Sequence, residues 1–299
     1  MTADTPAMHL ESLAGVSPTH VFRDVLETTT AYKSRSVVSF TGWSTLLLVE
    51  RADVPGVEFV AKGFFGYHSV IDAAPVQLRP ELHGYYWYRQ LPEQAHRYAR
   101  DHFVQEANLL SRLSGSPYFP KLVEMNLAAP VPHYVMDYLP LGSVRQWLAA
   151  HGAPSADAAV AFARRLLTGM AVLHDAGYVH RDINAENVLM ADDGPVIADL
   201  GCVRALTAAE PRSPKSALIS WPPEYDAGYH EADFASDLYC FGMVMYELLA
   251  GTMPRYGAPP LRSVATEHDP RLVDLVERCV QWSRDGRPQS AAAALEALS

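Results

Sequence analysis

The sequence has little cysteine, no cluster of basic residues and no long apolar run. Its 299 residues include three cysteines, at positions 202, 240 and 279, whose wide spacing predicts neither a disulfide framework nor a paired metal-ligand motif. The formal net charge of -10 argues against nucleic acid or an anionic membrane as a partner. No apolar run could span a bilayer, and residues 1–30 lack the segments of a secretory signal. We therefore expect a cytoplasmic protein.

What the sequence does have is a change of character along its length. Residues 36–62 are rich in Val, Phe, Thr and Leu and are interrupted at 53–56, which predicts antiparallel strands joined by a turn. Long helical patterns dominate the second half, and the change falls near residues 137–142. The fold class is therefore α+β. We expect an extension or tail at residues 1–30, a strand-rich part at 31–138 and a mostly helical part at 139–299.

Several helix ends are marked by residue type. Pro92 begins a helical pattern that runs to about Leu113. Ser155 is expected to cap a helix running through residue 173, and Ser236 one that ends at Gly251. One face of the first of these helices gathers Phe103, Glu106, Ala107, Leu110 and Leu113.

Two neighbouring motifs carry the strongest functional signal. Residues 179–189 read VHRDINAENVL, and the triplet DLG follows at 199–201 behind the apolar residues 196–198. In order and spacing they resemble the catalytic loop and metal-binding triplet of the eukaryotic-type (Hanks-type) protein kinases, and in particular bacterial serine/threonine protein kinases. The resemblance implies a bilobal protein-kinase-like fold. Its N-lobe would hold a small antiparallel sheet with one regulatory helix, and its larger C-lobe would be mostly helical.

The resemblance also assigns roles. Phosphoryl transfer needs a carboxylate that orients the attacking hydroxyl and oxygen ligands that hold magnesium across the phosphates. Asp182 would take the first role, and Asn187 and Asp199 would be the metal ligands. Residues 60–62, reading VAK, are similar to the family's phosphate-anchoring motif, which makes Glu106 the ion-pair partner of Lys62. The predicted catalytic residues are Asp182, Lys62, Glu106, Asn187 and Asp199, with ATP and Mg²⁺ as cofactors.

The nucleotide-binding residues follow from the same resemblance. Residues 42–49, reading GWSTLLLV, are the candidate glycine-rich loop, but Ser44 and Leu47 stand where the family has its second and third glycines. Residues 136–139 are the candidate hinge. The expected set is Gly42, Ser44, Val49, Ala61, Lys62, Met136, Asp137, Leu139 and Leu189.

Further motifs concern anchoring and regulation. Residues 222–224, reading PPE, resemble the triplet that closes the activation segment, and Arg287 is the expected buried partner of Glu224. Asp237 and Gly242 occupy positions of structural anchors in the family. In the family, the arginine at the position of Arg181 often pairs with a phosphorylated residue of the activation segment. We therefore predict autophosphorylation within residues 202–220. The candidate acceptors are Thr207, Ser213, Ser216 and Ser220.

Two departures from the family pattern leave alternatives open. Asn184 replaces a lysine that usually contacts the phosphate, and residues 64–91 form an insertion that includes YYWYR at 85–89. The insertion could dock a protein partner or fold over its own lobe. The favoured function is a protein kinase acting on serine or threonine of protein substrates. The degenerate glycine loop and Asn184 leave open a pseudokinase that binds nucleotide without transfer. The other alternative is a kinase-like enzyme whose acceptor is a small molecule or peptide.

Overall fold

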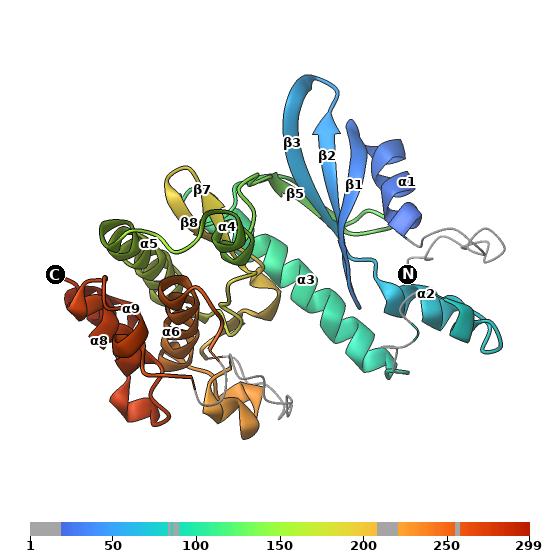
Figure 1. Cartoon of the computed structure of the whole chain (residues 1–299). Coiled ribbons are helices and arrows are strands. Elements are labelled where there is room, and N and C mark those ends of the chain that lie inside the picture. The colour runs from blue at the N-terminus through green and yellow to red at the C-terminus, as the bar shows by residue number, and fades with distance from the viewer. Residues whose placement is uncertain (1–18, 83–84, 86–89, 208–220, 255–257) are drawn as a thin grey trace. The chain divides into compact units, whose positions relative to one another are not determined.

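The computed structural model describes residues 19–82, 85, 90–207, 221–254 and 258–299 (Figure 1). The chain divides into two compact units. The first, here called the N-lobe, comprises Met1–Gly115 and Pro120–Tyr138, and the second, the C-lobe, comprises Ser116–Phe119 and Leu139–Ser299. No helix in the described ranges has both the length and the apolar character needed to cross a membrane.

The N-lobe is built on one five-stranded sheet in the order β1-β2-β3-β5-β4, and every neighbouring pair is antiparallel. The antiparallel sheet expected from the sequence is thus confirmed. Along β2, alternate residues from Thr45 to Val49 are buried, which is the two-residue period of a strand with one face in the core. The strands are β1 (Tyr32–Phe40), β2 (Thr45–Arg51), β3 (Val54–Gly63), β4 (Leu122–Asn126) and β5 (His133–Asp137).

The turn between β2 and β3 lies earlier than the predicted residues 53–56. Residues 52–53 make the turn, while Pro55 and Gly56 belong to β3. The strand register shifts next to Arg51, and Gly56 has a φ of +82°. A bulge with glycine in the left-handed region accounts for this, so the residue types that signal a turn here mark the bulge beside it.

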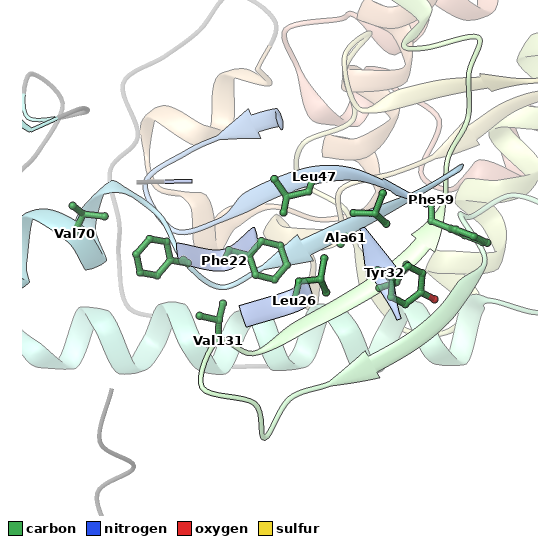
Figure 2. Close-up of a cluster of buried hydrophobic side chains, with 11 residues drawn as sticks. Phe22, Leu26, Tyr32, Leu47, Phe59, Ala61, Val70 and Val131 are labelled. Carbon is green, nitrogen blue, oxygen red and sulfur yellow. The ribbon is translucent and has the colours of Figure 1, made fainter. Parts of the chain in front are cut away.

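Helix α1 (Thr19–Thr29) packs on the sheet, in a stretch for which the sequence offered no functional signal. Phe22 and Leu26 are four residues apart, so they share one helix face, and both are 0% exposed. They belong to the hydrophobic cluster of Figure 2. Residues 19–29 are therefore part of the N-lobe core and not of a flexible tail. The buried members of the cluster are Phe22, Leu26, Tyr32, Leu47, Val49, Phe59, Ala61, Phe65, Val70, Val131 and Val135.

The segment around the predicted insertion adds further helices. Helix α2 (Tyr67–Ala73) and the 3-10 turn η2 (Arg79–Glu81) lie within residues 64–91, and α3 (Glu93–Leu113) begins after Pro92 as predicted. Phe65 and Val70 join the core cluster, so the first part of the insertion folds onto its own lobe. The described N-lobe thus has three helices, where the sequence predicted one. Tyr85 is exposed, and residues 86–89, on which the docking hypothesis rested, lie outside the described residues.

The C-lobe is mostly helical, as expected. Its long helices α5 and α6 pack against α9 and α8 respectively, and short strands form two separate two-stranded sheets, β6 with β9 and β7 with β8. Its elements are α4 (Val144–His151), α5 (Ala156–Asp175), β6 (Tyr178–Val179), β7 (Val188–Ala191), β8 (Gly194–Ile197), η4 (Leu200–Cys202), β9 (Arg204–Ala205), η5 (Pro223–Asp226), η6 (Tyr229–Glu231), α6 (Phe234–Ala250), α7 (Leu261–Val264), α8 (Pro270–Cys279), η7 (Arg284–Gly286) and α9 (Ala291–Glu296).

Helix caps in the C-lobe confirm one prediction and correct another. Ser155 caps α5 by accepting a hydrogen bond from the backbone N–H of Ala158. The N-cap of α6 is Asp233 and not Ser236, which lies three residues inside the helix. The two side chains exchange hydrogen bonds with each other's backbone N–H groups, so Ser236 is the return partner of a capping box. Gly251 ends α6 in the left-handed region, as predicted.

Candidate functional site

Among the predicted site residues of the N-lobe, Lys62 and Glu106 form a buried ion pair. Lys62 lies on β3, and its Nζ is 2.7 Å from Oε1 of Glu106 on α3. The hydroxyl of Tyr134 on β5 donates to the same oxygen at 3.0 Å. The two charged side chains are 9% and 4% exposed, so water screens their attraction weakly. The predicted pairing of Lys62 with Glu106 is confirmed, and it ties the sheet to α3.

Strand alternation corrects two of the predicted nucleotide contacts. Ala61 precedes Lys62 on β3, so its side chain points to the opposite face of the sheet. That face is the hydrophobic cluster of Figure 2, which contains both Ala61 and Val49. Each of these two predictions is off by one residue, because it rests on residue type and not on the two-residue period of a strand. Lys62 pairs with Leu46 on β2 and with Tyr134 on β5. Val60, two residues earlier on β3 and therefore on the same face as Lys62, pairs with Leu48 on β2 and with Met136 on β5.

The candidate glycine-rich loop is a tight turn fixed to the insertion. Between β1 and β2, the N–H of Thr41 donates to the carbonyl of Ser44 at 2.9 Å. Helix α2 begins against this turn, and the N–H groups of Tyr67 and His68 donate to the carbonyls of Thr41 (3.0 Å) and Gly42 (3.1 Å). These N–H groups lie in the first turn of a helix, where no intrahelical acceptor exists, so the loop acts as the cap of α2.

An aromatic stack reinforces this contact. The indole of Trp43 lies 4.6 Å from the ring of His68, and the ring of His96 on α3 meets it edge-on at 5.0 Å. Desolvation by burial lowers the pKa of His68, with the charge of Asp72 opposing that shift, so the ring is held neutral at physiological pH. These contacts join the candidate glycine-rich loop to the first part of the insertion.

The predicted hinge residues lie at the boundary of the two units. Met136 and Asp137 end β5 in the N-lobe, and Leu139 begins the long segment of the C-lobe. The N–H of Asp137 donates to the carbonyl of Lys121 at 3.0 Å, so a base could be recognised at Asp137 through its carbonyl oxygen. Burial raises the pKa of the Asp137 carboxyl, with the charge of Lys121 opposing.

The predicted site residues of the C-lobe include a loop, residues 180–187, that is anchored by α6. Asp237 is fully buried, and its carboxylate accepts the backbone N–H groups of His180 (2.7 Å) and Arg181 (2.8 Å). Nε2 of His174 on α5 lies 3.0 Å from the same carboxylate. A buried carboxylate must be satisfied in this way, and here its partners are the residues that precede Asp182. This role explains the anchor position that the sequence assigned to Asp237.

Arg181 is strained and buried. Its φ is +71°, a left-handed conformation that costs about 1–2 kcal/mol for a residue with a Cβ. Its carbonyl accepts hydrogen bonds from the hydroxyls of Tyr225 and Tyr229, and its guanidinium lies 4.3 Å from the centre of the Tyr229 ring. Its Nε donates to the carbonyl of Cys202 at 2.6 Å. Of the predicted phosphate acceptors for this arginine, Ser213, Ser216 and Ser220 lie outside the described residues.

Two amides hold the side chain of Asp182. Nδ2 of Asn187 donates to Oδ2 of Asp182 at 2.9 Å, and Nδ2 of Asn184 lies 3.3 Å from Oδ1. Both amides also donate to the Asp182 carbonyl, at 2.9 and 3.1 Å. Asp182 is half-buried, and these contacts orient its carboxylate.

Asn187 and Asp199 are brought together by backbone pairing. Strands β7 and β8 form an antiparallel pair, and the N–H of Ala198 donates to the carbonyl of Asn187 at 2.9 Å. Asp199, the next residue, is exposed and has a φ of +54°. Leu189, a predicted nucleotide contact, is half-buried on β7. An amide oxygen and an exposed carboxylate suit a hard cation such as Mg²⁺, so this donor set fits the predicted metal.

A second buried ion pair lies within the C-lobe, between Glu224 and Arg287. The guanidinium of Arg287 donates to both carboxylate oxygens of Glu224, at 2.8 and 3.0 Å, as predicted. Burial alone would raise the pKa of Glu224, but hydrogen bonds from Arg287 and Ser236 outweigh it and hold that pKa below its ordinary value. Gly242 has a packing role, because a Cβ there would come within 2.8 Å of the Cys279 side chain on α8.

Comparison with known proteins decides the family. A family model described as "Protein tyrosine and serine/threonine kinase" matches residues 87–294. The chain belongs to this protein kinase family. The model match begins after β3, so the degenerate glycine loop and Lys62 lie before it.

Individual relatives agree with the family. Serine/threonine-protein kinase PknL of Mycobacterium tuberculosis is 41% identical over 132 residues, which is 42% of this chain and 32% of that protein. Serine/threonine-protein kinase AfsK of Streptomyces coelicolor is 28% identical over 206 residues, 64% of this chain and 25% of that protein. Tyrosine-protein kinase Abl of Drosophila melanogaster is 25% identical over 203 residues, 62% of this chain and 12% of that protein. The matched segments thus span 32% or less of the length of these relatives.

Sequence reasoning missed some residues that shape this kinase site. Val60 could have been found by counting two residues back from Lys62, whereas Leu48 depends on the register between β2 and β3. Asn184 was noted as a departure, but its contacts with Asp182 depend on the path of the loop. The stacking of Trp43 on His68 depends on a long-range contact and has no local sequence signal.

Proposed function

We propose that this protein is an ATP-dependent protein kinase that transfers the γ-phosphoryl group to serine or threonine hydroxyls of protein substrates, including its own. The observation that carries the proposal is the loop that orients Asp182 with two amides beside the Asn187–Asp199 pair. Family membership supports the reaction class. The names of PknL and AfsK support serine or threonine as the acceptor.

In this proposal each residue has one task. Asp182 accepts the proton of the attacking hydroxyl while the bond between the γ-phosphorus and the leaving oxygen of ADP breaks. Lys62, held by Glu106, binds nucleotide phosphates. Asn187 and Asp199 hold Mg²⁺, which supplies charge neutralisation for the transferred group. The adenine contacts proposed for the sheet are Leu48, Val60 and Met136, in place of Val49 and Ala61.

The hinge and the loop complete the nucleotide site proposed here. The carbonyl of Asp137 and the backbone of Leu139 would hydrogen-bond the adenine, and Leu189 would contact the ring. Gly42 and Ser44 would cover the phosphates. We also propose the cytoplasm as its location, because buried thiols such as those of Cys240 and Cys279 suit a reducing compartment.

The test compares the wild type with Asp182→Asn, using labelled ATP, Mg²⁺ and generic acceptor proteins, with phosphorylated residues identified by mass spectrometry. The wild type should form phosphoserine or phosphothreonine, and Asp182→Asn should lose about 100-fold or more in kcat. Asp192→Asn, an exposed position in the turn between β7 and β8, is the matched control and should keep wild-type activity. Nucleotide binding by the wild type without transfer to any protein would overturn the proposal and leave the pseudokinase or a small-molecule acceptor.

A further inference from the structure

Asn184 stands where many kinases have a lysine. Both the oxygen and the nitrogen of its side-chain amide make hydrogen bonds within the loop. Its Oδ1 accepts the backbone N–H groups of Glu186 (2.9 Å) and Asn187 (3.1 Å). Its Nδ2 approaches the carbonyl (3.1 Å) and Oδ1 (3.3 Å) of Asp182. The oxygen therefore closes an Asx turn in the loop, and the nitrogen contacts the proposed catalytic carboxylate.

Each of the two amides contacts a different oxygen of the Asp182 carboxylate. Asn187 takes Oδ2 at 2.9 Å and Asn184 takes Oδ1 at 3.3 Å. A carboxylate held at one oxygen can still rotate about its Cβ–Cγ bond, whereas one held at both has a fixed plane. Because a proton acceptor must lie within hydrogen-bond reach of the hydroxyl it serves, the plane of this group bears directly on transfer.

We propose that Asn184 is a positioning residue that fixes the plane of the Asp182 carboxylate. The inference rests on the proposed function. Asn184 acts through Asp182 and not on ATP. Its loss should therefore lower kcat and leave KM for ATP unchanged.

The test separates the two halves of the amide. Asn184→Asp keeps an oxygen for the N–H groups of Glu186 and Asn187 but has no donor for Asp182. Asn184→Ala removes both. Both variants should lose at least about ten-fold in kcat, with KM for ATP within about two-fold of wild type. Asn184→Ala alone should also show a lower thermal midpoint, because the Asx turn loses its acceptor.

Ser155→Ala is the control for a purely structural loss. It removes the cap of α5 and should lower the thermal midpoint without changing kcat. If either Asn184→Asp or Asn184→Ala has the kcat of the wild type, Asn184 serves only the turn and the inference is overturned. The wild type is measured in the same assay, so absence of transfer by the wild type identifies failure of the proposed function, and this inference falls with it.

Discussion

The backbone of Gly42 lies so close to Gly66 that a Cβ on Gly66 would come within 2.4 Å of the Gly42 carbonyl carbon and oxygen. Contacts this short do not occur in folded proteins, so the residue that precedes α2 must be glycine for the helix to pack against the turn. Gly66 itself has an extended conformation with a φ of -135°, which alanine also adopts. The requirement at this position is therefore steric and not conformational.

Gly66→Ala should detach the turn at residues 41–44 from α2. We expect the amides of Tyr67 and His68 to exchange with deuterium at least about ten-fold faster, because each loses its acceptor in the turn. KM for ATP should rise if the turn covers nucleotide. Gly115→Ala is the control, since a Cβ at Gly115 would meet no atom within 4 Å. Equal exchange in the two variants would show that α2 does not hold the turn.

The Lys62–Glu106 pair should behave as a buried pair whose halves depend on each other. Glu106→Gln leaves the Lys62 ammonium without its carboxylate in a buried site, at a cost of about 3 kcal/mol in the free energy of unfolding. The double variant Lys62→Met/Glu106→Gln removes that charge and should regain at least half of the loss, while remaining inactive.

The exposed pair of Glu93 and Arg97 on the same helix provides the reference for this measurement. Glu93→Gln should change the unfolding free energy by less than about 0.5 kcal/mol. Denaturant unfolding of the four proteins gives the comparison. A double variant no more stable than Glu106→Gln would contradict the account.

Helix α1 should contribute to N-lobe stability in proportion to its buried side chains. Phe22→Ala removes a ring that is 0% exposed, so we expect a loss of about 3 kcal/mol in the free energy of unfolding. Asp24→Ala, an exposed position on the same helix, should change it by less than about 0.5 kcal/mol. Similar small effects for both substitutions would mean that α1 is not part of the core.

The Glu224–Arg287 pair predicts a pH dependence with a defined sign. The pKa of Glu224 is lowered in the folded protein from an ordinary value of 4.5, so the stability it contributes is present above 4.5 and lost as the pH falls through the lower, folded value. Glu224→Gln should therefore be less stable than the wild type near pH 7. The difference should shrink as the pH falls below 4.5, and a difference independent of pH would refute the linkage.

The sequence predicted those features that depend on local pattern or on motif order. The sheet, α3, the cap at Ser155 and the pairs Lys62–Glu106 and Glu224–Arg287 belong to this group. Asp233 was missed as the cap of α6 because Ser236 is equally good by residue type, and only the backbone path decides between the two.

Features that depend on distant contacts could not be predicted. The glycine loop precedes β2 and α2 follows β3, so their contact joins segments that are distant in the sequence. Hydrophobic periodicity carries no signal for such a contact. Val49 and Ala61 were expected to contact nucleotide for a different reason: matching of motif letters does not respect the alternation of β3, and both residues lie in the hydrophobic cluster. The core role of Phe22 was missed because a single amphipathic stretch does not reveal which sheet it covers.

The contact between α1 and β3 has an evolutionary consequence. A Cβ on Gly63 would come within 2.6 Å of the Phe22 ring, so the space that a side chain at position 63 would need is already occupied by this aromatic residue of α1. A larger side chain at either position therefore requires a smaller one at the other. Among close relatives we therefore expect the two positions to vary as a pair, with alanine at the second accompanied by a smaller side chain at the first. The combination Phe22→Leu/Gly63→Ala should accordingly be tolerated better than Gly63→Ala alone.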